Sequence, residues 1–172
     1  MIEMLIVISM FIVLLPTIFA ILSTILRQQL RLYRIVEAKR QGDAALAFMK
    51  ERISREGYAV QDTFGNIYCD QAGEQYTTSD GTRFRFLLGS GNTLYFFRER
   101  ASVLEYVTAP PTISTSLTAN TVQISNFQIS CYRRSLNSPP IIQISYTVLA
   151  TDNISTISLP YKTKVRLLLS AP

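Results

Sequence analysis

The sequence predicts an α+β protein in which one long N-terminal helix packs against a mostly antiparallel β-sheet head. Two observations predict this fold class. A long uncharged apolar run leads directly into residues with helical periodicity, and the period then changes to the two-residue alternation of β-strands. The chain has 172 residues, which is enough for one modest domain plus an appendage.

The apolar run is long enough to cross a membrane as a helix. Residues 4–26 contain no charged residue and only four hydroxyl side chains. At about 1.5 Å per residue this stretch spans roughly 34 Å, which is sufficient for the core of a bilayer. A cleaved secretory signal is the alternative, but it would have a basic start, a shorter apolar core and a small-residue cleavage site. We therefore expect residues 1–26 to form a single membrane-spanning half-helix that carries a soluble head.

The helical pattern continues beyond the apolar run. At 100° per residue, seven residues between Ile35 and Ile53 fall in one arc of about 100°, as expected for a core-facing stripe. Residues 2–55 are therefore predicted to form one helix that is amphipathic over 27–56, and Gly57 is placed to end it in a left-handed conformation. The stripe comprises Ile35, Ala38, Gly42, Ala45, Leu46, Met49 and Ile53.

Residues 57–172 are predicted to form a β-rich globular head. The sequence "TRFRFLLGSGNTLYFFRERA" indicates a hairpin with a four-residue loop around Gly89 and Gly91, and "LYFF" at 94–97 is expected in the sheet core. A third strand is predicted at "SVLEYVT". The next segment, "APPTISTS", is predicted to be a proline-broken connection.

Three further strands are predicted towards the C-terminus. The segment "TVQISNFQISCYRR" keeps apolar residues on one face across a one-residue slip at Asn126, which predicts a β-bulge. The segment "SPPIIQISYTVLAT" alternates without interruption. The last strand, "TISLPYKTKVRLLLS", carries Lys162, Lys164 and Arg166 on one side. We expect the helical stripe to cover the apolar face of this sheet.

The composition excludes several kinds of chemistry. Histidine is absent, so the usual catalytic triads and imidazole metal sites are excluded. The sequence "LLGSGN" lacks the lysine of a phosphate-binding loop. Cys69 and Cys131 both fall in the head, where either a disulfide or two buried free thiols would be consistent with the sequence. We expect no metal or cofactor, and the sequence provides no case for an enzyme.

Charged residues of the head give weaker signals. The sequence "CYRRS" places Tyr132 beside Arg133 and Arg134, which would suit a phosphate or DNA contact, although a charged loop between strands is the favoured interpretation. The net charge of +5 is too small and too evenly spread to argue for nucleic-acid binding by itself. Solvated surface positions are expected for the carboxylates Asp62, Asp70, Glu99 and Glu105.

The start of the chain, "IEMLIVIS" followed by further apolar residues, resembles the N-terminal segment of type IV pilins and type II secretion pseudopilins. Glu3 matches the glutamate of that family, in which a basic leader is removed and the new N-terminus is methylated. The segments "LTANTVQISNFQIS", "SPPIIQISYTVLAT" and "ISLPYKTKVRLLL" are similar in strand spacing to the final strands of larger-headed minor pilins and pseudopilins.

The resemblance implies a non-enzymatic minor pilin or pseudopilin that starts or caps a filament. Its helix would first cross the inner membrane once, with the head outside the cytoplasm, and later pack in a filament at the cell surface or in the periplasm. Implied partners are other pilin or pseudopilin subunits, a prepilin peptidase and an inner-membrane assembly platform. The alternatives are a major pilin, or a signal-anchored membrane protein whose head binds a ligand or DNA.

Two features depart from the family pattern. Glu3 has two residues before it where the family has four, so we expect upstream in-frame codons to encode a short Lys/Arg leader ending in Gly and two further residues. Pro16 lies about one turn earlier than the proline of major pilins; because it lacks a backbone donor, we expect a kink or local melting there. Basic residues beyond the span would alone favour a cytoplasmic head, and a basic leader would restore the opposite orientation. These basic residues are Arg27, Arg31, Arg34, Lys39 and Arg40.

The resemblance also implies a role for Glu3. A processed N-terminus is a cation, and it leaves water when helices pack in a filament. A carboxylate on the neighbouring helix would neutralise it and fix the axial register, and truncating one partner of a buried ion pair typically costs about 3–5 kcal/mol. The alternative is an interaction of Glu3 with the dipole of its own helix, which contributes about 0.3–1 kcal/mol.

Overall fold

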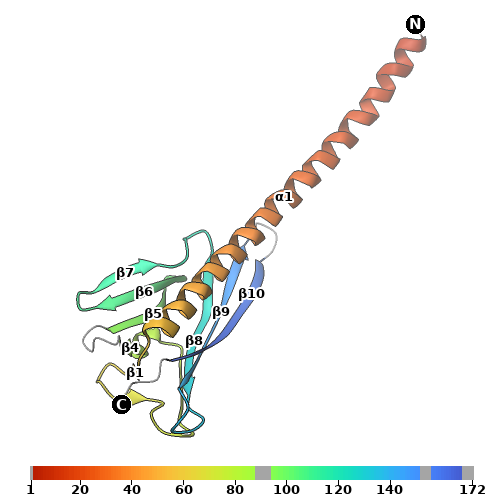
Figure 1. The fold of residues 1–172 in the computed structure, drawn as a ribbon. Coiled ribbons are helices and arrows are strands. Elements are labelled where there is room, and N and C mark those ends of the chain that lie inside the picture. The colour runs from red at the N-terminus through yellow and green to blue at the C-terminus, as the bar shows by residue number, and fades with distance from the viewer. Residues whose placement is uncertain (1, 88–93, 152–155, 168–172) are drawn as a thin grey trace. The chain divides into compact units, whose positions relative to one another are not determined.

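The computed structural model describes residues 2–87, 94–151 and 156–167 of the chain. The chain divides into two compact units, Met1–Glu37 and Ala38–Pro172. The boundary falls inside the long helix α1 (Ile2–Glu56), so each unit contains part of that helix (Figure 1). The predicted α+β fold class, with one long N-terminal helix and antiparallel sheets, is confirmed.

Helix α1 is continuous through Pro16, so of the two expected effects, a kink or local melting, the local melting is wrong (Figure 1). It ends at Glu56, where the amide of Gly57 donates a last helical bond of 3.0 Å to the carbonyl of Ile53. The expected left-handed conformation of Gly57 is also wrong, because its φ is not positive. Glycine is needed there for space instead: a Cβ would lie 2.6 Å from the Ile53 carbonyl oxygen and 2.8 Å from Leu167 Cδ2.

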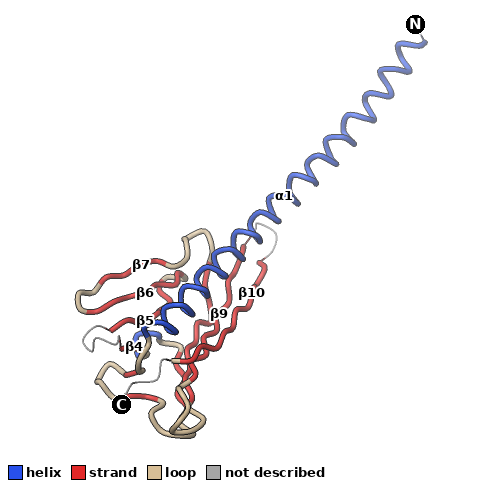
Figure 2. The backbone as a smooth tube through the Cα atoms, in the orientation of Figure 1, coloured by secondary structure: helices blue, strands red, loops and turns tan. Residues whose placement is uncertain are grey.

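The second unit contains two antiparallel sheets where the sequence predicted one (Figure 2). A short 3₁₀ helix, η1 (Gly81–Arg83), precedes β4 (Arg85–Leu87). The six-stranded sheet has the order β2 (Ile67–Tyr68), β1 (Val60–Gln61), β4 (Arg85–Leu87), β5 (Leu94–Arg100), β6 (Val103–Ala109) and β7 (Ile113–Ser116). The four-stranded sheet has the order β10 (Thr156–Arg166), β9 (Ile141–Thr151), β8 (Gln123–Tyr132) and β3 (Gln75–Thr78).

The six-stranded sheet contains the predicted hairpin. Strands β4 and β5 pair antiparallel, with Phe86 opposite Tyr95, and β6 follows as the predicted third strand. The loop expected around Gly89 and Gly91 lies outside the described residues. The segment predicted as a connection is partly wrong, because β7 pairs with β6 as an edge strand. The two prolines lie before β7 begins, so they remove no donor from its ladder.

The long strands of the four-stranded sheet follow the predicted alternation. Every second residue of β9 from Ile142 to Ala150 is buried. The predicted bulge in β8 is confirmed, because the register with β9 shifts between Ser125 and Gln128, and Asn126 between them has a φ of 56°. The bulge lets apolar residues on both sides of it face the core.

The α1 segment from residue 38 onward packs against both sheets, and its predicted stripe forms part of the core. Ala38, Ala45, Met49 and Ile53 are buried in one apolar cluster with side chains of the two sheets. Strands β9 and β10 lie beside this segment of α1 in Figure 1. Tyrosines tie the sheets to helix carbonyls: Tyr146 donates to Gly42 at 2.8 Å, Tyr161 to Lys39 at 3.1 Å and Tyr95 to Arg52 at 3.2 Å.

Candidate functional site

Residues 8–26 of the first unit present an apolar surface on all sides of the helix. The large apolar side chains from Ile8 to Leu26 are 43–67% exposed. This is one helix that is long and apolar enough to cross a membrane. Apolar surface on this scale is typical of a segment that is covered by lipid or by other chains.

The hydroxyl side chains of this stretch hydrogen-bond within the helix. Thr17 Oγ1 donates to the carbonyl of Leu14 at 2.7 Å. Ser23 and Thr24 both donate to the carbonyl of Ala20, at 2.9 and 2.8 Å. Because a polar group without a partner is costly in an apolar medium, these bonds make the residues compatible with a lipid environment.

Glu3 lies exposed in the first turn of α1, and Pro16 lies exposed in the interior of the helix. No other charged residue precedes Arg27. The position of Glu3 suits an interaction with the partial positive charge at the helix N-terminus. Its predicted pairing with the N-terminal amine of another subunit stays a prediction.

In the head, Cys69 and Cys131 form a disulfide with a Cα–Cα distance of 6.2 Å. Both residues are buried. The bond ties the segment that follows β2 to β8 of the other sheet. It therefore links the two sheets covalently across 62 residues of sequence.

The side chain of Arg133 links two neighbouring loops by hydrogen bonds and an ion pair. It is 15% exposed. Its guanidinium forms an ion pair of 3.2 Å with Asp70 Oδ1 and donates at 2.6 Å to the carbonyl of the same residue. It also donates to the carbonyls of Ser135 and Ser138, at 3.2 and 3.0 Å, and to that of Leu136. Because the donors of Arg133 are occupied by the protein itself, they are poorly placed for a phosphate.

The other two residues of the predicted phosphate contact have different environments. Tyr132 is half-buried on β8, with the Lys164 ammonium 5.9 Å from its ring centroid. Arg134 is exposed beyond the end of that strand. The structure therefore does not bring Tyr132, Arg133 and Arg134 together as one exposed surface.

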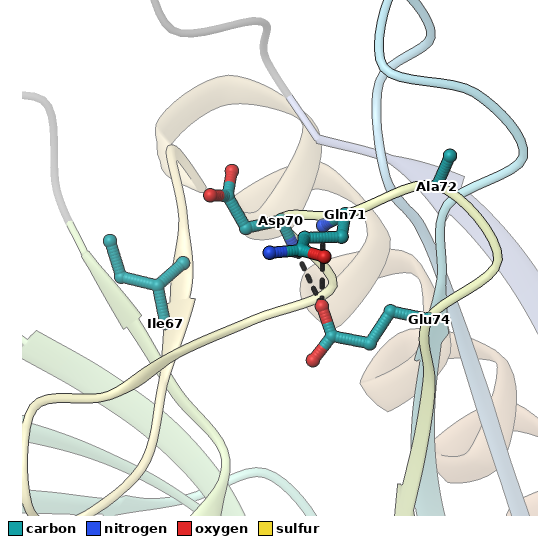
Figure 3. Close-up of a pocket in the computed structure, with 5 residues that line it drawn as sticks. All are labelled: Ile67, Asp70, Gln71, Ala72 and Glu74. Carbon is teal, nitrogen blue, oxygen red and sulfur yellow. Dashed lines mark hydrogen bonds between the residues drawn. The ribbon is translucent and has the colours of Figure 1, made fainter.

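A shallow pocket lies over the loop after β2, lined by Ile67, Asp70, Gln71, Ala72 and Glu74 (Figure 3). Glu74 turns back on the loop, and its Oε2 accepts from the amides of Asp70 and Gln71 at 3.0 and 3.3 Å. The Asp70 carboxylate points away from that of Glu74. In the part of the chain that the structure describes, no three His, Cys, Asp or Glu side chains converge as metal ligands.

Asp62 is buried, which corrects the prediction that it lies on the solvated surface. Its Oδ1 accepts from the amides of Phe64 and Asn66 at 2.7 and 2.9 Å, and its Oδ2 accepts from Asn66 Nδ2 at 2.7 Å. Burial alone would raise the pKa of Asp62, but the bonds from Asn66 and Phe64 outweigh it and lower the pKa below its ordinary value. The sequence "DTFGN" is typical of such a turn and could have identified this role.

Glu105 is also less exposed than predicted. Its carboxylate is 2.8 Å from Arg98 Nε across the β5–β6 pair. Burial opposes ionisation, but bonds from Arg98 and Ser114 outweigh it and lower the pKa of Glu105. Asp70 and Glu99 are exposed, as predicted. Asp62 and Glu105 therefore stabilise a turn and a strand pair of the head.

Comparison of the chain with family models, curated proteins and solved structures finds no match.

Proposed function

We propose that this chain is a non-enzymatic structural subunit, a minor pilin or pseudopilin, that assembles through α1 into a type IV pilus or a secretion pseudopilus. The observation that carries the proposal is the helix itself: an apolar surface exposed from Ile8 to Leu26, preceded by Glu3. The resemblance of the first residues to the pilin family adds to it. Starting or capping the filament is the role that we favour among such subunits.

The exposed apolar surface needs a cover, and two covers suit a helix of this kind. Before assembly the cover is the inner membrane, where every backbone bond of a helix is satisfied internally. After assembly it is the helices of neighbouring subunits. In the membrane the protein spans once with its head outside the cytoplasm, which is also a compartment where the Cys69–Cys131 disulfide persists.

Glu3 gives assembly its register. The N-terminal amine of a processed subunit is a cation, and burying it among apolar helices is favourable only if an anion accompanies it. A carboxylate in the first turn of the next helix supplies that anion at one axial position. Apolar contacts alone would allow helices to slide, because they are not directional.

The test compares Glu3→Ala with Glu51→Ala, which removes an exposed carboxylate from the same helix. We expect both variants to reach the membrane fraction, but only Glu3→Ala to be depleted from sheared filaments, by roughly a hundredfold or more. In filaments sheared from the wild type, an abundance of this chain far below that of the main filament protein would identify it as a minor subunit.

Two outcomes contradict the proposal. Normal incorporation of Glu3→Ala would show that the carboxylate has no role in assembly. A chain that stays monomeric in lipid and keeps Met1 as an unprocessed start, as shown by mass spectrometry, would instead identify a signal-anchored membrane protein.

A further inference from the structure

The outward face of the four-stranded sheet has a different composition from the rest of the head. Alternation sends the apolar residues of β8, β9 and β10 towards the core and the intervening residues outward. The outward residues are mainly glutamine, serine and threonine. None of the outward positions that are described on these strands or on β3 is acidic.

Three basic residues form a column on this face. Lys162, Lys164 and Arg166 are exposed outward positions of the edge strand β10. Alternate residues of a strand are about 6.6–6.8 Å apart, so the column is roughly 13 Å long. Lys164 extends from β10 across β9 towards the Tyr132 ring on β8, which moves positive charge towards the middle of the sheet. We call this outward surface, with its column, the basic face.

The column is not neutralised within the described part of the protein. No ion pair joins Lys162, Lys164 or Arg166 to a carboxylate among the described residues. Several arginines elsewhere do have one. These ion pairs are Arg52–Glu56, Arg55–Glu51, Arg83–Asp80, Arg98–Glu105 and Arg133–Asp70.

We propose that the basic face binds the phosphate backbone of duplex DNA without reading its sequence. Lysine, arginine, serine, threonine, glutamine and tyrosine are the side chains that contact phosphates and sugars in protein–DNA complexes, and these residue types dominate this face. About 13 Å of duplex carries roughly eight phosphates around its circumference, so those on the side that faces the sheet are enough for three cations.

The geometry favours a duplex over a single strand. Proteins that hold single strands stack bases on exposed aromatic rings. The aromatic residue of this face, Tyr132, is half-buried and lies beneath the Lys164 ammonium. A sheet face also has no helix or ribbon to insert into a groove, so contacts with the backbone dominate.

The proposal does not depend on filament assembly. The salt dependence of the DNA affinity can be estimated from the number of phosphate contacts. Three phosphate contacts give a slope of log K against log salt of about −2.7. Affinity should then fall roughly fortyfold between 50 and 200 mM salt. A single head is therefore a weak binder, and binding is best measured at low salt.

The experiment measures fluorescence anisotropy of a labelled mixed-sequence duplex with the full chain in non-ionic detergent micelles. The test variant is Lys162→Gln/Lys164→Gln/Arg166→Gln. The matched control, Lys50→Gln/Arg55→Gln/Arg83→Gln, removes the same charge from exposed positions outside the basic face. Near-ultraviolet circular dichroism checks that each variant keeps the fold of the head.

We expect the test variant to bind the duplex at least tenfold more weakly than the wild type at 50 mM salt. The slope of log K against log salt should also become much smaller. The control should stay within about twofold of the wild type, and Lys162→Arg/Lys164→Arg should bind as the wild type does. Equal losses in both triple variants would overturn the proposal in favour of a net-charge effect. Absence of duplex binding, or binding to the carboxylate polysaccharide alginate in its place, would also overturn it.

Discussion

The two units of the chain place the same kind of side chain in opposite environments. Ile12 in the first unit is 65% exposed, whereas Ile53 on the same helix in the second unit is 0% exposed. Both residues are in unbroken helix, so local helix formation is not what distinguishes them. The second unit buries its apolar side chains against two sheets, whereas those of the first unit from Ile8 to Leu26 are exposed.

This difference separates what stabilises each unit. In the second unit, packing, the tyrosine bonds to the helix carbonyls and one disulfide all lie within residues 38–172. In the first unit, the internal contributions include the backbone bonds of the helix and the bonds from Thr17, Ser23 and Thr24 to helix carbonyls. A change in the second unit should therefore alter the stability of the head, and a change in the first should alter insertion or association.

The largest effect should follow removal of the disulfide. Closing a loop of 62 residues corresponds to about 4 kcal/mol in the chain-entropy model. We expect Cys69→Ala/Cys131→Ala to lower the free energy of unfolding of the head by that amount. The measurement is urea unfolding in micelles followed by near-ultraviolet circular dichroism, which reports on the head because eight of the nine tyrosines follow residue 38.

The same experiment sharpens the comparison between the units. Far-ultraviolet circular dichroism in micelles should retain the helical signal of the first unit when the head has unfolded. An unchanged unfolding midpoint would show that the two sheets hold together without their covalent link. Loss of all helical signal in the same transition would show that the units are not independent.

A matched pair of isoleucine truncations should give an effect of similar size at one position and no effect at the other. Ile53→Ala removes buried methyl groups and should cost the head about 2–5 kcal/mol. Ile12→Ala removes the same atoms from an exposed position and should leave the unfolding of the head unchanged. Equal destabilisation by both truncations would contradict the division of the chain into two differently stabilised units.

The features of the fold that could be predicted from sequence are those with a local period. Helix α1, its buried stripe and the alternation of β9 each repeat over many residues. The bulge at Asn126 could be predicted because one extra residue shifts the two-residue alternation of the strand. The division into two sheets has no such signal, because β3 pairs with β8 while its sequence neighbours β2 and β4 belong to the other sheet, and pairings between distant strands leave no local pattern.

Errors about single residues arose where tertiary contacts decide. A positive φ is expected at Gly57, but the constraint there is the space beside the Ile53 carbonyl and Leu167, and Leu167 is far away in sequence. The strand β7 was missed because two prolines precede it, although an edge strand tolerates them. The adjacent residues Arg133 and Arg134 are equivalent in the sequence. Only the structure shows that Arg133 donates hydrogen bonds to loop carbonyls.

The smallest expected effect compares two acidic residues of the second unit. The pKa of Asp62 is lowered in the folded state, so its contribution to stability is present above the unfolded pKa of about 3.9 and is lost as the pH falls through the folded value. Asp62→Asn should therefore lower the melting temperature of the head at pH 7, and the gap to the wild type should narrow by pH 3. Asp43→Asn removes an exposed carboxylate from α1 and is the matched control for this substitution. A gap for Asp62→Asn that stays constant down to pH 3 would mean that the turn depends on the shape of the side chain and not on its charge.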